Sequence, residues 1–207
     1  MKKNLKSFTL VFLTAAALVL SFTACGSKES GTADSKAGTT ESTSAAGISA
    51  EAYDVGDFTV DVPGNYFVVT IPDYSADADE DGKQPACTDS IGLIKDGENE
   101  LDSYSNPTMY IYYYEGTTAE DESEGASWIY SDIKEFDYSV NGTDCIAMEG
   151  TMSYGESDDN PYEYYLIYIP INENDCINVI LPKSVEGLSL DPEADDVKAI
   201  IESVTLK

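Results

Sequence analysis

The stretch DPEADDVKAIIESV, residues Asp191–Val204, decides the fold class of this chain. Asp191 is a residue type that favours helix N-caps, and Pro192 suits the first helical position. The apolar residues that follow lie at i, i+3, i+4 and i+7: Val197, Ile200, Ile201 and Val204. They form one apolar stripe, which a helix buries against another element. We expect that element to be a sheet.

The residues before this helix predict the strands of that sheet. Thr108–Tyr114 alternates two sets of side chains between two faces, with Tyr110, Tyr112 and Tyr114 on one of them. Phe136–Val140 ends at Asn141-Gly142, a strong short-range signal for a hairpin. Three strands separated by polar connections follow: Cys145–Tyr154, Tyr162–Ile169 and Cys176–Leu181.

Further strands are predicted closer to the N-terminus. Phe58–Val62 and Phe67–Ile71 alternate apolar and polar residues, and the turn residues between them predict a hairpin or a bend. Ile91–Ile94 is a short strand candidate. A central helix is predicted from Thr118 to about Tyr130, because acidic residues suit its N-terminus.

Trp128, near the end of that central helix, is interpreted as a core anchor. Together these elements predict an α+β fold for residues 51–207: a single domain with a mostly antiparallel β-sheet, packed by a central helix and a C-terminal helix.

The order of these elements resembles the Mog1/PsbP-like superfamily. The pattern includes Phe58–Asn65 near the start, the central helix, Val140-Asn-Gly before a strand meander, and the apolar stripe of the last helix. Domains of this superfamily also occur on bacterial surface lipoproteins. The resemblance implies a binding or accessory module without a shared catalytic set.

Residues 1–24 predict a lipoprotein signal peptide. Lys2, Lys3 and Lys6 precede an uncharged run from Phe8 to Ala24, and small residues then lead into Cys25. Cys25 is therefore the expected lipidation site, and the alternative is an N-terminal membrane span. Residues 25–50, rich in Ser, Thr and Gly, predict the lipidated cysteine and a disordered tether. We expect a domain held by lipid on the extracytoplasmic face of the cell membrane.

The charge of the chain excludes one class of partner. It carries 39 Asp and Glu against 11 Lys and Arg, a formal net charge of −28, so nucleic acid would be repelled. All the basic residues are Lys, and there is no His, so His-dependent nucleophiles and His-based zinc sites cannot form. We expect no enzymatic activity, although a hydrolase that uses only carboxylates remains the third hypothesis.

An acidic segment is the only candidate cofactor site. Asp77, Asp79 and Asp81 alternate and precede Gly82, as at the start of a calcium loop, but Thr88 stands where a bidentate Glu belongs. The second hypothesis is therefore a calcium-dependent carbohydrate-binding or calcium-stabilised domain; a solvated acidic loop is the alternative, and no other cofactor is expected.

The tyrosines and cysteines give the remaining hypotheses. Two sets of tyrosines are predicted to align on strand faces, where they can line the core or bind a glycan or protein partner: Tyr110, Tyr112 and Tyr114, and Tyr162, Tyr164 and Tyr168. Cys87, Cys145 and Cys176 are an odd number. If the last three strands form a meander, Cys145 and Cys176 lie too far apart for a disulfide. The first hypothesis for function is a non-enzymatic surface lipoprotein that acts as a binding or accessory module of the envelope.

Overall fold

The structure, a computed structural model, describes residues 41–43, 49–153 and 161–207. The predicted signal peptide, Cys25 and most of the predicted tether lie outside these residues. Within the described part of the chain, no helix is both long and apolar enough to cross a membrane.

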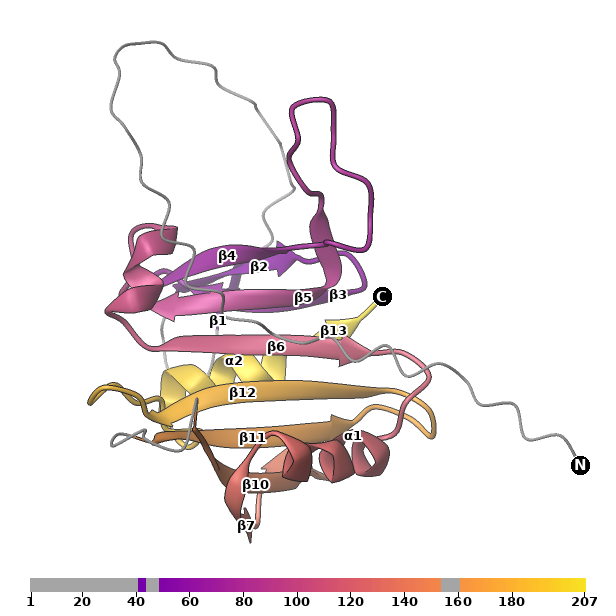
Figure 1. Cartoon of the computed structure of the whole chain (residues 1–207), viewed down its shortest axis with the longest axis vertical. Helices are drawn as coiled ribbons and strands as arrows, with labels where there is room; N and C mark the ends of the chain where they lie inside the picture. Colours follow the sequence, from indigo (N-terminus) through magenta and orange to yellow (C-terminus); the bar gives the residue numbers. More distant parts are fainter. Residues whose placement is uncertain (1–40, 44–48, 154–160) are drawn as a thin grey trace, which may run out of the picture. The chain divides into compact units, whose positions relative to one another are not determined.

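A seven-stranded antiparallel sheet forms the centre of the domain (Figure 1). Its strands, in spatial order, are β4 (Tyr66–Pro72), β5 (Ala86–Lys95), β6 (Thr108–Tyr114), β12 (Cys176–Ser184), β11 (Tyr162–Pro170), β10 (Ile146–Met152) and β7 (Ser131–Phe136). A smaller antiparallel sheet contains β1 (Glu41–Thr43), β2 (Ser49–Asp54), β3 (Phe58–Pro63) and β13 (Thr205–Leu206). The strands β8 (Ser139–Val140) and β9 (Thr143–Asp144) form a short hairpin.

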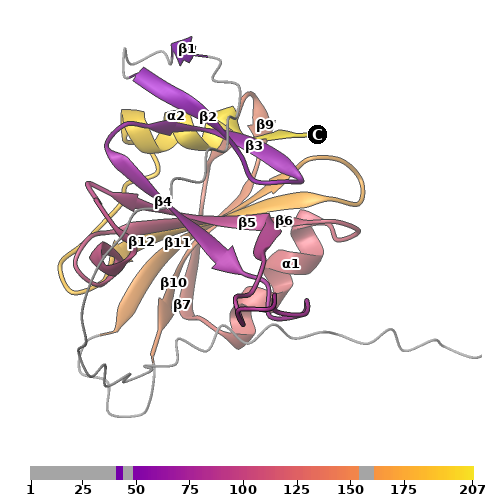
Figure 2. The same cartoon turned by 90° about the horizontal axis from the view of Figure 1, so that it is seen from above.

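Two α-helices lie on opposite faces of the seven-stranded sheet (Figure 2). The helix α2 (Asp195–Ser203) lies on the same side as the small sheet, and we call this side the inner face. The helix α1 (Ala119–Gly125) and the 3₁₀ turn η2 (Ala126–Trp128) cover part of the outer face. A second 3₁₀ turn, η1 (Glu100–Tyr104), follows β5. The α+β class and the mostly antiparallel sheet are therefore confirmed.

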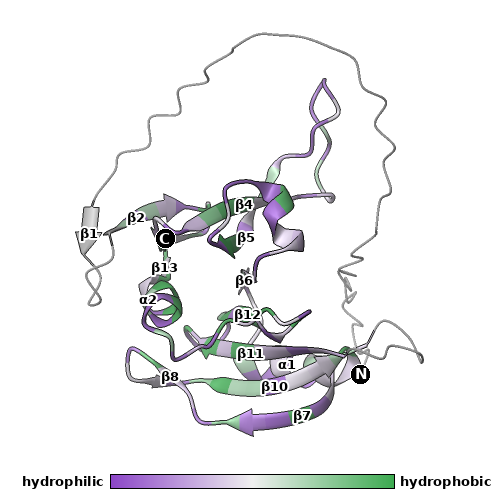
Figure 3. Ribbon diagram, turned by 90° about the vertical axis from the view of Figure 1, so that its left-hand side faces the viewer, coloured by the Kyte–Doolittle hydropathy of each residue, from purple (hydrophilic) through white to green (hydrophobic). Residues whose placement is uncertain are grey.

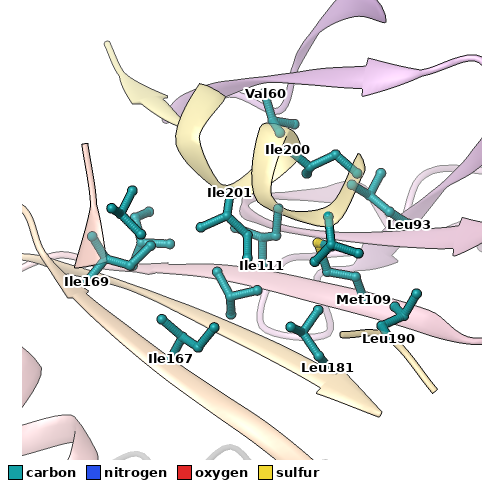
Figure 4. Close-up of a cluster of buried hydrophobic side chains, with 14 of the residues drawn as sticks. Val60, Leu93, Met109, Ile111, Ile167, Ile169, Leu181, Leu190, Ile200 and Ile201 are labelled. Atoms are coloured by element: carbon teal, nitrogen blue, oxygen red, sulfur yellow. The ribbon is translucent and has the colours of Figure 1, made fainter. Parts of the chain in front are cut away.

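Aliphatic side chains fill the inner face. Val197, Ile200 and Ile201 of α2 are almost completely buried, as the apolar stripe predicted. Figure 4 shows Ile200 close to Val60 of β3 and Leu93 of β5. Figure 3 shows α2 with one hydrophobic and one hydrophilic side, which is the pattern expected for a helix that packs on a sheet.

The predicted start of the last helix is three residues early. The helix begins at Asp195, after Ala194 as its N-cap residue. Asp191 instead stabilises a turn, because its Oδ1 accepts a hydrogen bond from the Glu193 amide at 2.9 Å. Its carbonyl oxygen accepts another from the Ala194 amide. A cap-like residue followed by proline suits such a turn as well as a helix start.

Several predicted strands agree closely with the structure. The strand β6 has the predicted bounds. Asn141 and Gly142 both have positive φ angles, 51° and 81°, as a two-residue hairpin turn of type I′ requires. The order β10-β11-β12 is the predicted meander. The short candidate at Ile91–Ile94 is the second half of a ten-residue strand.

The turn at Pro63-Gly64-Asn65 is a bend rather than a hairpin. The strand before it, β3, pairs with β2 and β13 in the small sheet. The strand after it, β4, pairs with β5 in the large sheet. The bend therefore takes the chain from one sheet to the other.

The prediction that Trp128 anchors the core is wrong. Its side chain is 85% exposed, whereas Ala119 and Ala126 are buried against the outer face of the sheet. At 100° per residue, Ala126 lies close to the direction of Ala119, and Trp128 lies about 180° away from it. The helix also ends at Gly125, much earlier than predicted, so it attaches to the sheet through two alanines.

Candidate functional site on the outer face

The outer face of the central strands carries polar and aromatic side chains. We call five of them, Tyr110, Tyr112 and Tyr114 of β6 and Tyr164 and Tyr168 of β11, the tyrosine face. The strand between them, β12, contributes Cys176, Asn178 and Ile180 to the same face. Tyr168 is buried and the other four rings are partly exposed, so the two sets of tyrosines are neither wholly core nor wholly surface.

The rings of β6 form a regular ladder. The centroids of Tyr110 and Tyr112 are 6.3 Å apart and those of Tyr112 and Tyr114 are 6.4 Å apart, each pair with an interplanar angle of 22°. The ring of Tyr110 lies over Gly92 of β5, since a Cβ at that glycine would be 3.3 Å from the ring. Strand alternation thus places a row of rings side by side along the middle of the sheet.

Asn178 is a buried polar residue at the centre of this face. It pairs with Tyr112 of β6 on one side and with Tyr168 of β11 on the other. The residue is 6% exposed, and its side chain interacts with the Tyr114 phenol and lowers the pKa of that phenol, against the larger effect of burial. Its carbonyl oxygen, Oδ1, is buried and has no hydrogen-bond partner among the residues that the structure describes. A buried acceptor without a partner costs about 1–3 kcal/mol.

Glu122 of α1 lies on the rim of this group. On the helix it lies three residues after Ala119 and four before Ala126, so it shares their side of α1. Its carboxylate is close enough to Tyr114 and Tyr168 to raise the pKa of both phenols. Desolvation, with a smaller contribution from Asp121, raises the pKa of Glu122 itself. We call Tyr112, Tyr114, Tyr168, Glu122 and Asn178 the Asn178 cluster.

The phenols of the Asn178 cluster stay neutral at physiological pH. Burial raises the pKa of Tyr114 to about 12, and it also raises the pKa values of Tyr112 and Tyr168. Neutral tyrosines offer a ligand their ring faces and hydroxyl groups without adding charge. Glu122 is therefore the member of the cluster that supplies negative charge.

The three described cysteines have free thiols. Cys176 is buried below the outer face, and burial raises its pKa to about 12. Cys145 is only partly buried, and burial raises its pKa to about 11. Cys176 opens β12 and Cys145 directly precedes β10. The strand β11 lies between β12 and β10, as the expectation of no disulfide between these two cysteines requires.

The candidate calcium residues lie in an exposed loop between β4 and β5. Asp79 Oδ1 accepts hydrogen bonds from the amides of Asp81 at 3.0 Å and Lys83 at 2.8 Å. Asp77 and Asp81 are exposed. In the described part of the chain, no group of three or more Asp, Glu, Cys or His side chains is arranged to hold a metal ion. Calcium binding by Asp77, Asp79 and Asp81 stays a prediction.

Other carboxylates are held by neighbouring side chains. Asp196 Oδ2 lies 2.8 Å from Lys95 Nζ and accepts a hydrogen bond from the Tyr66 hydroxyl at 2.9 Å. Glu149 Oε2 lies 2.5 Å from Lys183 Nζ. Asp158 and Asp159, adjacent carboxylates at which a carboxylate-based hydrolase would need to be tested, lie outside the described residues.

Sequence reasoning found the tyrosines of the cluster but missed Asn178 and Glu122. Asn178 is the one polar residue in the buried part of β12, so a lone amide in an apolar strand was the available signal. Glu122 stands between two alanines at helical spacing, so a charged residue on the small-residue side of a helix was the other. Neither signal shows that Asn178 and Glu122 lie near each other, because that depends on how the strands pair and where α1 packs.

Comparisons with known proteins give little further information. No family model and no curated protein matches the chain. A crystal structure of a protein from Bacteroides thetaiotaomicron, at 1.50 Å resolution, has a TM-score of 0.44 and 9% sequence identity. The match covers 75% of this chain and 48% of that one, so this chain spans about half of its length. A similarity at this level indicates neither an activity nor a ligand.

Proposed function

We propose that this protein is a lipid-anchored lipoprotein of the extracytoplasmic membrane face that acts as a non-enzymatic binding module through its tyrosine face. The observation that carries the proposal is the unpartnered Asn178 Oδ1 within a group of partly exposed tyrosines. A fold that keeps a buried acceptor without a partner gives up stability there. Such a position suits a ligand that supplies the missing donor.

We also propose that the domain has a Mog1/PsbP-like fold. A strand and bend near residues 58–65, a central helix, a strand meander and a last amphipathic helix follow one another as in the Mog1/PsbP-like superfamily. The role expected from that resemblance is a binding or accessory one.

Binding through the outer face is tested with envelope material from the producing cell. Purified wall, glycan and membrane-protein fractions are titrated against the full-length wild-type protein and the Asn178→Leu variant. Leu has a similar size and removes the amide, so the fold should survive, and thermal melting checks this. We expect one fraction to bind the wild type and to lose affinity for the variant. Equal binding of both proteins, or binding of neither, would overturn the proposal.

The anchor is tested separately. Cys25→Ala should move the protein from the membrane fraction to the medium or leave it unprocessed, because the lipid would have no attachment site. Cys87→Ala removes a thiol elsewhere and serves as the control that stays with the membrane. A Cys25→Ala protein that is still lipid-bound would contradict the anchoring.

A further inference from the structure

The Asn178 cluster offers acceptors, ring faces and negative charge, but no positive charge. In the described residues, the ion pairs of lysines are Lys95–Asp196, Lys183–Glu149, Lys198–Glu193 and Lys207–Asp54. Glu122 takes part in none of them. Its carboxylate is partly desolvated and close enough to Tyr114 and Tyr168 to raise the pKa of both phenols, and no lysine of the described residues forms an ion pair with it.

Further acidic residues surround the cluster. Asp89 of β5 is close enough to Tyr114 to affect the pKa of its phenol, and Asp175 and Glu120 have the same effect on the Cys176 thiol. An anionic ligand would meet repulsion from all of these groups. A neutral sugar could stack on a ring, but it would leave Glu122 without a counter-charge.

A metal cation fits the cluster less well than an organic one. Calcium takes six to eight oxygen ligands, roughly, and magnesium demands near-ideal octahedral geometry. The Asn178 cluster provides one carboxylate, one amide oxygen and three neutral tyrosines, and neutral phenols are not among the usual ligands of either ion. Ring faces attract organic cations, and this attraction strengthens when the site is desolvated.

We propose that the Asn178 cluster binds a protonated amine, an organic cation that carries N–H donors. This inference rests on the proposed binding function of the tyrosine face. The ammonium group lies against the rings of Tyr112 and Tyr114, pairs with the Glu122 carboxylate and donates a hydrogen bond to Asn178 Oδ1. Oδ1 is buried in the free protein, so this contact requires a neighbouring side chain to move aside.

Three small probes separate charge from hydrogen bonding. The full-length protein is titrated at constant ionic strength with n-butylammonium, with neutral 1-butanol and with n-butyltrimethylammonium, which is charged but has no N–H donor. Tyrosine ring signals in NMR spectra report binding. We expect n-butylammonium to bind at least about tenfold more tightly than 1-butanol, and n-butyltrimethylammonium to lie between them. Equal affinity for n-butylammonium and 1-butanol would overturn the proposal.

Glu122→Gln and Glu124→Gln are a matched pair of variants, because each removes one charge from α1. Glu122→Gln should weaken n-butylammonium binding at least about tenfold, whereas Glu124→Gln, on the exposed side, should leave it unchanged. Glu122→Gln should also raise the melting temperature at pH 7. The raised pKa of Glu122 in the folded state means that its ionisation costs stability as the pH rises, and glutamine removes that cost. Similar affinities of the two variants would contradict the assigned contact.

The two proposals can fail separately. If an envelope fraction binds in an Asn178-dependent way but n-butylammonium does not displace it, the tyrosine face binds a ligand of another class. If no fraction depends on Asn178, the proposed function itself is wrong.

Discussion

The two faces of the seven-stranded sheet differ in what their side chains do. The inner face is aliphatic: Ile111, Ile177 and Leu181 are almost completely buried under α2 and the small sheet. The outer face carries partly exposed tyrosines, a buried amide and a charged residue of a seven-residue helix. One sheet thus separates the aliphatic core, which stabilises the fold, from a face that carries polar groups, among them the buried Asn178 Oδ1. Substitutions on the two faces should therefore differ in their effect on stability.

The largest expected effect compares two isoleucines of β12 that point to opposite faces. Ile177→Ala should lower the free energy of unfolding by about 3–4 kcal/mol, because Ile177 is completely buried in the inner core. Ile180→Ala, on the partly exposed outer face, should cost about 1–2 kcal/mol. Both variants lose the same atoms from the same strand. Urea denaturation measures both, and equal losses would break the distinction between the faces.

A second pair of variants tests how α1 and η2 are held on the outer face. A Cβ at Gly150 of β10 would lie 2.8 Å from the Cβ of Tyr130, just after η2, so Gly150→Ala should cost about 1–3 kcal/mol. Gly125 has a helical φ of −65° and open space around it. Gly125→Ala should therefore stabilise by about 0.5–1 kcal/mol. Thermal melting compares the two variants. An unchanged melting temperature for Gly150→Ala would mean that the contact with Tyr130 does not hold α1 and η2 on the outer face.

Asp196 links α2 to the edge of the inner face, and its contribution should depend on pH. Burial alone would raise its pKa, but the hydrogen bonds and charge of Lys95 and the hydrogen bond of Tyr66 outweigh burial and lower it. Stabilisation by a carboxylate with a lowered folded pKa is present above about pH 4 and is lost as the pH falls through that folded pKa. Asp196→Asn should cost about 1 kcal/mol at pH 7 and less at pH 3.

The exposed neighbour Asp195 provides the control for this experiment. Asp195→Asn should have little effect at either pH, because no ion pair in the described residues includes it. Urea titrations at pH 7 and pH 3 measure all three proteins. A cost of Asp196→Asn that stays constant between the two pH values would show that the ion pair does not act as described.

The smallest effect is expected at Trp128. Its side chain is 85% exposed, so Trp128→Ala should change stability by less than about 0.5 kcal/mol. Phe58→Ala, which empties a fully buried position of the inner core, should instead cost about as much as Ile177→Ala. A large loss of stability for Trp128→Ala would show that Trp128 anchors the core after all.

These residues also show what the sequence could predict. Local patterns were sufficient for β6, for the Asn141-Gly142 turn and for the apolar stripe of α2, because each depends on neighbouring residues along the chain. The division into two sheets depends on β3 pairing with residues near 205, which no local pattern records. Trp128 was misplaced because it points away from the side on which Ala119 and Ala126 are buried. Asn178 and Glu122 come together only when β12 and α1 meet.

The pairing of β13 with β3 also affects how the domain folds. Thr205 lies opposite Thr59, and the Lys207 amide donates a hydrogen bond to the carbonyl oxygen of Asp57, so contacts join residues almost 150 positions apart. Such distant contacts must overcome a large loop-closure entropy, which makes folding slow. The core also needs Ile200 and Ile201, so a nascent chain that ends before them leaves the strands around Val60 uncovered. The order of synthesis therefore delays closure of the core until residues near 205 are available.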